Sequence, residues 1–243
     1  MGSGKTTNII REMNEHPENK YVFITPYLKE GKRVIRECPN LGFYEPDDMI
    51  SKSVSFEMLL KSGVNIVSTH ELFKRMKPCK DTLSRVSEYG YNLIIDEDIQ
   101  VIDQIQVSKS DDSILKKLLL EEKSDGTVQC SDSKYSGRFA DIITKAKNSS
   151  LFMFENSIMW SMPSEMIMAF STITITTFRY EHSLMNIYMN NLGFSKEYYH
   201  IKDSEIVREL DDLSDFKRNA RSRIKVYNGK LNYDAKNQTA LSV

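Results

Sequence analysis

The feature that most constrains the fold is a run rich in glycine, lysine and threonine at the start of the chain, G-S-G-K-T-T from Gly2 to Thr7. Backbone N–H groups that converge on a phosphate need glycines, which let the chain approach the anion, and a helix N-terminus pointing at the charge. The segment T-T-N-I-I-R-E-M that follows has the apolar periodicity of such a helix. A phosphate-binding loop of this kind normally follows a buried strand, so the run predicts an α/β fold.

The side chains of this run suit a nucleotide held together with magnesium. A lysine, here Lys5, neutralises the β- and γ-phosphates, and a hydroxyl, here Thr6, completes the shell of the metal ion. A simple glycine-rich turn is the alternative interpretation. The predicted nucleotide-binding residues are Gly2, Ser3, Gly4, Lys5, Thr6 and Thr7.

Short apolar runs alternate with helical patterns along the rest of the chain. The runs typical of buried strands are 20–26, 64–70, 91–98 and 170–178, with a weaker one at 197–201. The helical patterns are 6–15, 55–63, 70–76, 80–90, 111–123 and 181–193. Wholly apolar strands that alternate with helices favour a mainly parallel sheet. Residues 123–136 are rich in Ser, Asp and Gly and are expected to form a surface loop.

Two acids follow the third predicted strand. The run N-L-I-I-D brings Asp96 and Glu97 to its carboxyl end, where open α/β sheets place their ligand crevice. We expect Asp96 to hold Mg²⁺ through water and Glu97 to polarise the attacking water, so that Lys5 and Glu97 are the predicted catalytic residues. The alternative is that Asp96, Glu97 and Asp98 begin a solvated loop.

Hydroxyl side chains end other predicted strands. Thr25, Thr69 and Thr176 hold such positions, and a basic stretch over 29–33 follows the first of them. Such groups can contact a nucleic-acid backbone or couple it to the nucleotide. The alternative for Thr25 and Thr69 is an ordinary strand-to-helix cap, and for Thr176 a β-rich core strand.

Two further stretches are interpreted mainly as structure. The methionine-rich segment 153–168 is expected to fill the core rather than to form a binding surface. The basic cluster 217–225 is expected to be a solvated helix, with nucleic-acid contact or an arginine finger as the alternative.

Composition places few limits on the partner but does indicate a compartment. The 243 residues carry a net charge of −1, although a neutral protein can still present a local basic groove. The three cysteines lie far apart, which fits neither a disulfide framework nor a zinc site and indicates a reducing cytoplasm. The sequence has no apolar run of membrane-spanning length and no signal-peptide pattern, so we expect a cytoplasmic protein of a bacterial or phage-infected cell without a membrane partner.

Taken in order, these segments resemble the first RecA-like motor domain of superfamily 2 helicases, particularly the divergent phage and prophage members. G-S-G-K-T-T is similar to motif I, I-T-P-Y-L-K-E to motif Ia and V-S-T-H-E-L-F to motif Ib. I-I-D-E-D resembles motif II, as a variant of the DEAD/DEAH box in which Asp98 and Ile99 take the last two places. S-T-I-T-I-T-T stands where motif III belongs, and the resemblance covers about residues 1–201.

The resemblance implies a three-layer P-loop NTPase domain of RecA-like fold with a mainly parallel sheet. It implies ATP and Mg²⁺ as cofactors, DNA or RNA as partner with replication proteins as further candidates, and hydrolysis coupled to helicase or translocase activity. Lys5, Thr6, Asp96 and Glu97 inherit the ATPase roles, and Thr25, Thr69 and Thr176 the strand-contact or coupling roles.

The resemblance also sets the expected domain organisation. Residues 1–178 would form the RecA-like ATP-binding domain, and 179–243 the start of a second domain or a C-terminal extension with a loose tail. In the family a second RecA-like domain supplies arginine fingers, but the sequence has no Q-x-x-R-x-x-R motif, and motif III lacks its A-T pair. The first glycine of the full loop motif and the strand that feeds the loop would precede Met1, so we expect an N-terminally incomplete version of a longer protein.

Two other functions remain open at this point. The chain would be another phage P-loop ATPase, such as a packaging or remodelling motor, or a truncated relic that binds nucleotide or nucleic acid without hydrolysis. The response of ATP turnover to DNA distinguishes these possibilities from a helicase motor.

Overall fold

The computed structural model describes residues 4–132, 135–178, 180–202 and 205–208. The chain divides into two compact units, residues 1–196 and 197–243. The division expected from the sequence, 1–178 and 179–243, stays a prediction. The basic cluster 217–225 and the two loop residues Gly2 and Ser3 lie outside the described residues.

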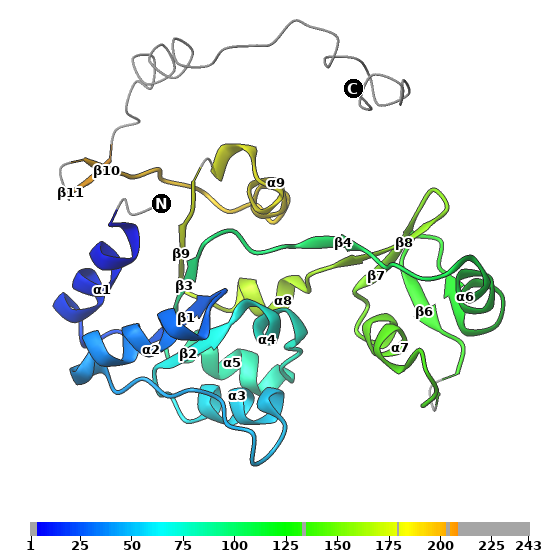
Figure 1. Ribbon diagram of the computed structural model, residues 1–243, viewed down its shortest axis with the longest axis horizontal. Helices are drawn as coiled ribbons and strands as arrows, with labels where there is room; N and C mark the ends of the chain where they lie inside the picture. The colour runs from blue at the N-terminus through cyan, green and yellow to red at the C-terminus, as the bar shows by residue number, and fades with distance from the viewer. Residues whose placement is uncertain (1–3, 133–134, 179, 203–204, 209–243) are drawn as a thin grey trace, which may run out of the picture. The chain divides into compact units, whose positions relative to one another are not determined.

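The first unit is built on a parallel sheet of four strands with the order β2-β1-β3-β9. Its members are β1 (Tyr21–Thr25), β2 (Ile66–Thr69), β3 (Asn92–Asp96) and β9 (Thr172–Thr176). The four strands predicted from the sequence and the mainly parallel sheet are therefore confirmed (Figure 1).

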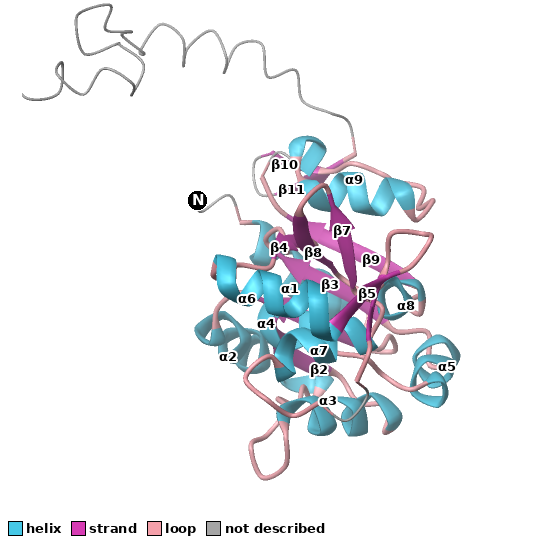
Figure 2. Ribbon diagram, turned by 90° about the vertical axis from the view of Figure 1, so that its right-hand side faces the viewer, coloured by secondary structure: helices cyan, strands magenta, loops and turns pink. Residues whose placement is uncertain are grey.

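Helices cover both faces of this sheet. They are α1 (Lys5–Glu15), α2 (Leu28–Glu37), α3 (Lys52–Lys61), α4 (His70–Arg75), α5 (Lys80–Glu88), α8 (Ser164–Met168) and α9 (Leu184–Asn191), with short 3₁₀ turns at Pro39–Leu41 and Tyr180–His182. Figure 2 shows the strands flanked by helices.

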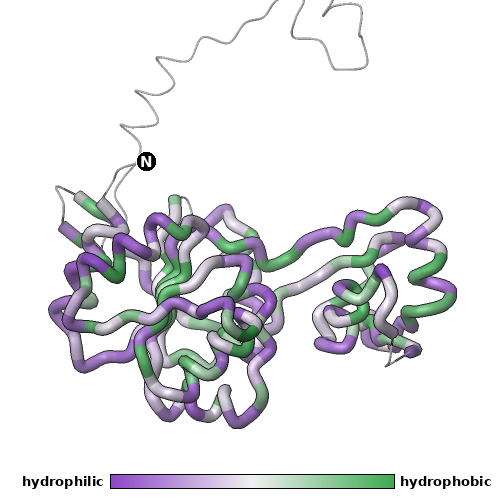
Figure 3. Tube along the Cα trace, turned by 60° about the horizontal axis from the view of Figure 1, so that its bottom comes forward, coloured by the Kyte–Doolittle hydropathy of each residue, from purple (hydrophilic) through white to green (hydrophobic). Residues whose placement is uncertain are grey.

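Alternation along the strands sends their side chains to two separate cores. Phe23, Val67 and Ile94 pack with apolar residues of α1 and α2. Their neighbours Val22 and Ile24 belong to the other core, which also contains buried residues of α3, α4 and α5. The sheet and its covering helices thus form three layers. In Figure 3, stretches of apolar residues (green) alternate with hydrophilic ones (purple) along the trace.

A second set of strands lies in the chain between β3 and β9. Strands β4 (Ile102–Gln104), β7 (Leu151–Phe154) and β8 (Ser157–Ser161) form an antiparallel sheet with the order β4-β8-β7. The remaining elements are α6 (Lys109–Ile114), the π-helix Leu115–Leu119, β5 (Leu120–Glu122), β6 (Val128–Cys130) and α7 (Ala140–Lys147). We call residues 102–161 the inserted segment; it is green in Figure 1.

The inserted segment corrects two expectations. The helix predicted over 111–123 ends earlier, because residues 120–122 pair as β5 with β6. The loop predicted over 123–136 contains β6, whose Val128 is buried in the core. Strands of three residues are too short to produce a detectable alternation, so sequence periodicity misses them.

The methionine-rich segment 153–168 contributes to the core as expected, but only over part of its length, because Phe154 is exposed and Met153 and Met159 are half-buried. Its residues Ile158, Trp160, Met162 and Met166 are buried, although Met168 at its end is exposed.

In the second unit, β10 (His200–Lys202) and β11 (Glu205–Val207) pair as antiparallel strands, and β10 overlaps the weaker strand predicted over 197–201. No helix of the described ranges is long and apolar enough to span a membrane.

Candidate functional site

The carboxyl ends of the four parallel strands meet at one edge of the sheet. The register pairs Thr25 with Thr69 and Asp96 with Thr176, and Ile24 with Ile95 one step before them. The predicted residues at the ends of β1, β2, β3 and β9 are therefore level with one another. Open parallel sheets bind their ligands at this edge.

A glycine in the left-handed conformation directly precedes α1. Gly4 precedes the helix with φ 77°, in the left-handed region that glycine adopts without a steric penalty. The buried Asn8 donates its side-chain amide to the carbonyl oxygen of Gly4 at 3.0 Å and accepts a hydrogen bond from Arg11 at 2.7 Å. The side chain of Asn8 thus stabilises the turn at Gly4, and Lys5 is the first residue of the helix.

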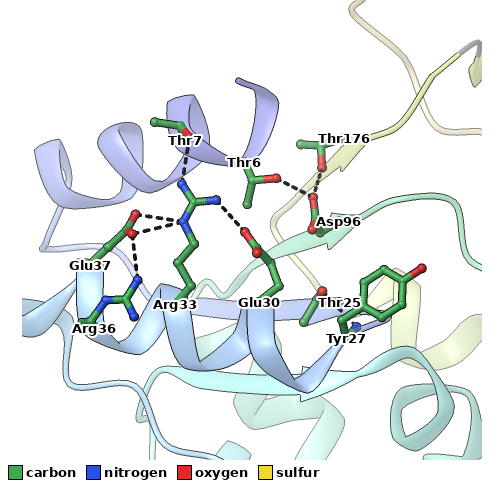
Figure 4. A network of polar contacts seen from close by, with 10 residues as sticks. All are labelled: Thr6, Thr7, Thr25, Tyr27, Glu30, Arg33, Arg36, Glu37, Asp96 and Thr176. Atoms are coloured by element: carbon green, nitrogen blue, oxygen red, sulfur yellow. Dashed lines mark hydrogen bonds and ion pairs between the residues drawn. The ribbon is translucent and has the colours of Figure 1, made fainter. Parts of the chain in front are cut away.

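The loop and the third strand meet at Asp96. The hydroxyl of Thr6 donates to Asp96 Oδ1 at 3.0 Å, and the hydroxyl of Thr176 donates to the same oxygen at 2.8 Å (Figure 4). Asp96 is only 8% exposed. Thr6 and Thr176, which the sequence places in separate motifs, therefore both contact Asp96. Thr6 lies 90 positions before Asp96 in the chain.

These groups fit a magnesium ion. Mg²⁺ is a hard cation that binds oxygen and usually keeps several waters, with one or two carboxylates and the substrate phosphates completing its shell. Thr6 and Asp96 supply a hydroxyl and a carboxylate within hydrogen-bond distance, and Asp96 Oδ2 accepts no hydrogen bond from the described residues. No group of three or more His, Cys, Asp or Glu side chains placed to hold a metal occurs in the described part of the chain.

Glu97 follows Asp96 in a special backbone conformation. Its φ is 64°, in the left-handed region that residues other than glycine seldom adopt, and its side chain is exposed. Its N–H donates to the carbonyl oxygen of Thr176 at 3.1 Å. The exposed carboxylate therefore starts from a backbone position that β9 helps to fix.

His70 contacts the same peptide group from the other side. Its Nε2 donates to the carbonyl oxygen of Asp96 at 2.9 Å, which places the proton of the neutral ring on Nε2. Burial lowers the pKa of His70, so the imidazole is neutral at pH 7. His70 is the first residue of α4 and directly follows β2.

A second network joins α1 to α2 (Figure 4). Arg33 of α2 donates to the hydroxyl of Thr7 at 2.8 Å and pairs with Glu30 at 2.8 Å and Glu37 at 3.1 Å. The hydrogen bond from Arg33 lowers the pKa of Glu37, and the same bond raises the pKa of Arg33. The last threonine of the predicted loop is thereby tied to the helix that follows β1.

The other predicted hydroxyls serve local structure. Thr69 caps α4, because its Oγ1 accepts a hydrogen bond from the N–H of Leu72 at 3.3 Å. Thr25 is 1% exposed and accepts from the N–H of Tyr27 at 3.4 Å. Both lie at the edge that carries Asp96, and their contact with nucleic acid stays a prediction.

Two residues contribute to the site although no motif in the sequence indicates a role for them, namely His70 and Asn8. The position of His70 after a strand end could be read from the sequence, but its bond to a backbone carbonyl could not. Asn8 could have been noticed as a polar residue on the inward side of α1, where it is 5% exposed.

The sequence of the chain is similar to that of a prophage protein. A family model described as the YonV middle domain matches residues 102–160, which is the inserted segment but for its last residue. The SPbeta prophage-derived uncharacterized protein YonV of Bacillus subtilis (strain 168) is 31% identical over 262 aligned positions. That alignment covers all of this chain and 63% of the relative, so the chain spans less than two thirds of the protein it resembles.

The comparisons support a prophage association and leave the chemistry open. No solved structure matches the chain. Neither match names a helicase.

Proposed function

We propose that this chain carries the first motor domain of an ATP- and Mg²⁺-dependent nucleic-acid translocase or helicase. The observation that supports the proposal most is the contact between Thr6 of the loop and Asp96 at the end of β3. A phosphate-binding helix terminus and a buried carboxylate meet in this way where a nucleotide and its metal ion must be held together.

Each of these residues has a separate role in the proposed reaction. Lys5 and the N–H groups at the start of α1 bind the triphosphate, and Thr6 and Asp96 hold the magnesium ion. The metal ion, when bound, neutralises charge that develops on the phosphate oxygens. Glu97 positions and polarises the water that attacks the γ-phosphate.

The RecA-like fold is part of the same proposal. The parallel sheet with helices on both faces is compatible with it, as is the place of the candidate site at the carboxyl ends of the strands. The outer edge of β9 pairs with no other described strand, and it is where a further parallel strand of that fold would lie. In the proposed organisation residues 1–178 form the motor domain and 179–243 a separate extension.

Nucleic acid as the partner is supported by the start of α2. Tyr27 is 62% exposed there, and Lys29 and Lys32 are exposed without an ion pair to any described residue. Free lysines beside an exposed aromatic ring suit a phosphate backbone and a stacked base. This surface lies at the end of β1, on the edge of the sheet that carries Asp96.

ATP turnover with and without single-stranded DNA or RNA tests the proposal. We expect turnover that rises with nucleic acid and that Lys5→Ala abolishes, with Lys29→Ala/Lys32→Ala losing the stimulation while keeping the basal rate. Turnover that is independent of nucleic acid would indicate another kind of P-loop ATPase. Nucleotide binding without turnover would indicate a relic.

A further inference from the structure

The peptide group between Asp96 and Glu97 is held at both of its polar atoms. Its carbonyl oxygen accepts the 2.9 Å hydrogen bond from His70 Nε2, and its N–H donates the 3.1 Å bond to the carbonyl oxygen of Thr176. The two partners come from different elements, since His70 begins α4 after β2 and Thr176 ends β9. Together they form what we call the peptide clamp, made of His70, Thr176 and the Asp96–Glu97 peptide.

The clamped peptide directly precedes the α-carbon of Glu97, whose backbone conformation is strained. Glu97 has φ 64°, a conformation that a residue with a side chain keeps only where its surroundings hold it. The backbone of Glu97 sets the direction of its carboxylate, and a rotation of the preceding peptide would turn that carboxylate elsewhere. The hydrogen bonds at both atoms of the peptide oppose such a rotation.

We propose that His70 is a positioning residue that keeps Glu97 aimed at the reacting phosphate. This inference rests on the proposed function, since it takes Glu97 as the group that polarises water. His70 touches neither nucleotide nor water in this role; it acts through the Asp96 carbonyl. Because His70 follows Thr69 at the end of β2, a ligand that moves this strand end shifts the donor and with it Glu97.

The experiment compares His70→Gln with His70→Asn. The amide nitrogen of glutamine reaches the place of the imidazole Nε2, whereas that of asparagine stops near the place of Nδ1, so only glutamine can donate to the Asp96 carbonyl. Both are neutral polar side chains of similar size, which limits differences in folding. His16→Asn is the matched control, because His16 is exposed and pairs with Glu18 away from the site.

Two kinds of measurement are made on each variant in the full chain. The first is kcat for ATP together with the Kd for ATP in the presence of Mg²⁺. The second is the rate of amide hydrogen exchange over residues 96–98, which reads the clamp without requiring turnover. We expect His70→Asn to lower kcat by about 10–100-fold while the Kd for ATP changes by less than about threefold. We also expect its exchange over 96–98 to quicken, whereas His70→Gln and His16→Asn keep wild-type values.

The outcomes separate this inference from the proposed function. If His70→Asn keeps the wild-type kcat and exchange rates, the clamp is overturned while ATP hydrolysis stands. If the wild-type chain lacks turnover but exchange quickens only in His70→Asn, the proposed hydrolysis fails and the clamp is upheld as a structural device. A His70→Gln variant that behaves like His70→Asn also overturns the inference, because the donor would then be irrelevant.

Discussion

At the scale of single residues, the site depends on how the buried carboxylate of Asp96 is satisfied. A buried charge is stable only where donors surround it, and here Thr6 and Thr176 both donate to one oxygen. The second of these bonds lies wholly within the sheet and does not need the loop. Thr176 is therefore expected to matter for stability even without nucleotide.

Thr176→Val tests this residue's contribution. Valine has nearly the same shape but cannot donate, so one bond to a buried carboxylate is lost. We expect the free energy of unfolding to fall by about 1–3 kcal/mol. The measurement is urea denaturation, with Thr174→Val as the control, since Thr174 is exposed on the same strand. Equal stability of the two variants would contradict the account of Asp96.

At the scale of elements, the packing of α2 on the sheet depends on Gly31. A Cβ atom at this position would lie 2.7 Å from Val67 Cγ1, and Val67 is a stiff, buried side chain of β2. The helix can therefore approach β2 only because Gly31 has no side chain. Arg33, two residues later on the same helix, reaches Thr7 from this position.

Gly31→Ala changes the free energy of unfolding through two effects of opposite sign. Alanine favours a helix over glycine by about 1 kcal/mol, whereas forcing a methyl group into a packed contact costs about 1–3 kcal/mol. We expect the clash to dominate and the free energy of unfolding to drop by roughly 1 kcal/mol. Lys32→Ala, at the neighbouring exposed position, should change it by less than about 0.5 kcal/mol. A Gly31→Ala variant more stable than the wild type would show that α2 packs less closely than described.

Much of the parallel sheet could be predicted from the sequence, and the inserted segment largely could not. Apolar or β-branched runs ending in Thr or Asp mark β1, β2, β3 and β9 clearly, and the order of the motifs predicts that Thr6 and Asp96 lie together. Strands β5 and β6 have three residues each and pair locally, which leaves no periodic signal. The bond from His70 goes to a backbone carbonyl, an acceptor that every residue has and that no sequence pattern reveals.

At the scale of the whole molecule, buried side chains form a continuous path from the parallel sheet into the inserted segment. The path includes Ile95 of β3, Leu115 and Val128 of the inserted segment, and Trp160 of β8. Elements joined by continuous buried packing within one small domain tend to unfold in a single transition. The inserted segment is therefore expected to be a cooperative part of the first unit rather than an independent module.

Trp160 makes this cooperativity measurable. It is the single tryptophan of the chain and is buried in the inserted segment, with Lys145 Nζ 5.7 Å from its ring centroid. We expect thermal unfolding followed by tryptophan fluorescence to coincide with that followed by far-ultraviolet circular dichroism. Two separated transitions, with Trp160 exposed first, would mean that the segment unfolds by itself.

In the proposed function, Thr6 and Asp96 form a magnesium–ATP site that Glu97 completes. The most direct test is Mg²⁺-dependent ATP hydrolysis by the wild-type chain, Asp96→Asn and Glu97→Gln, with Asp103→Asn of the exposed part of β4 as control. We predict that both site variants lose at least about 100-fold in kcat, that Glu97→Gln still binds ATP, and that the control keeps the wild-type rate. Unchanged hydrolysis in Asp96→Asn and Glu97→Gln would contradict the account.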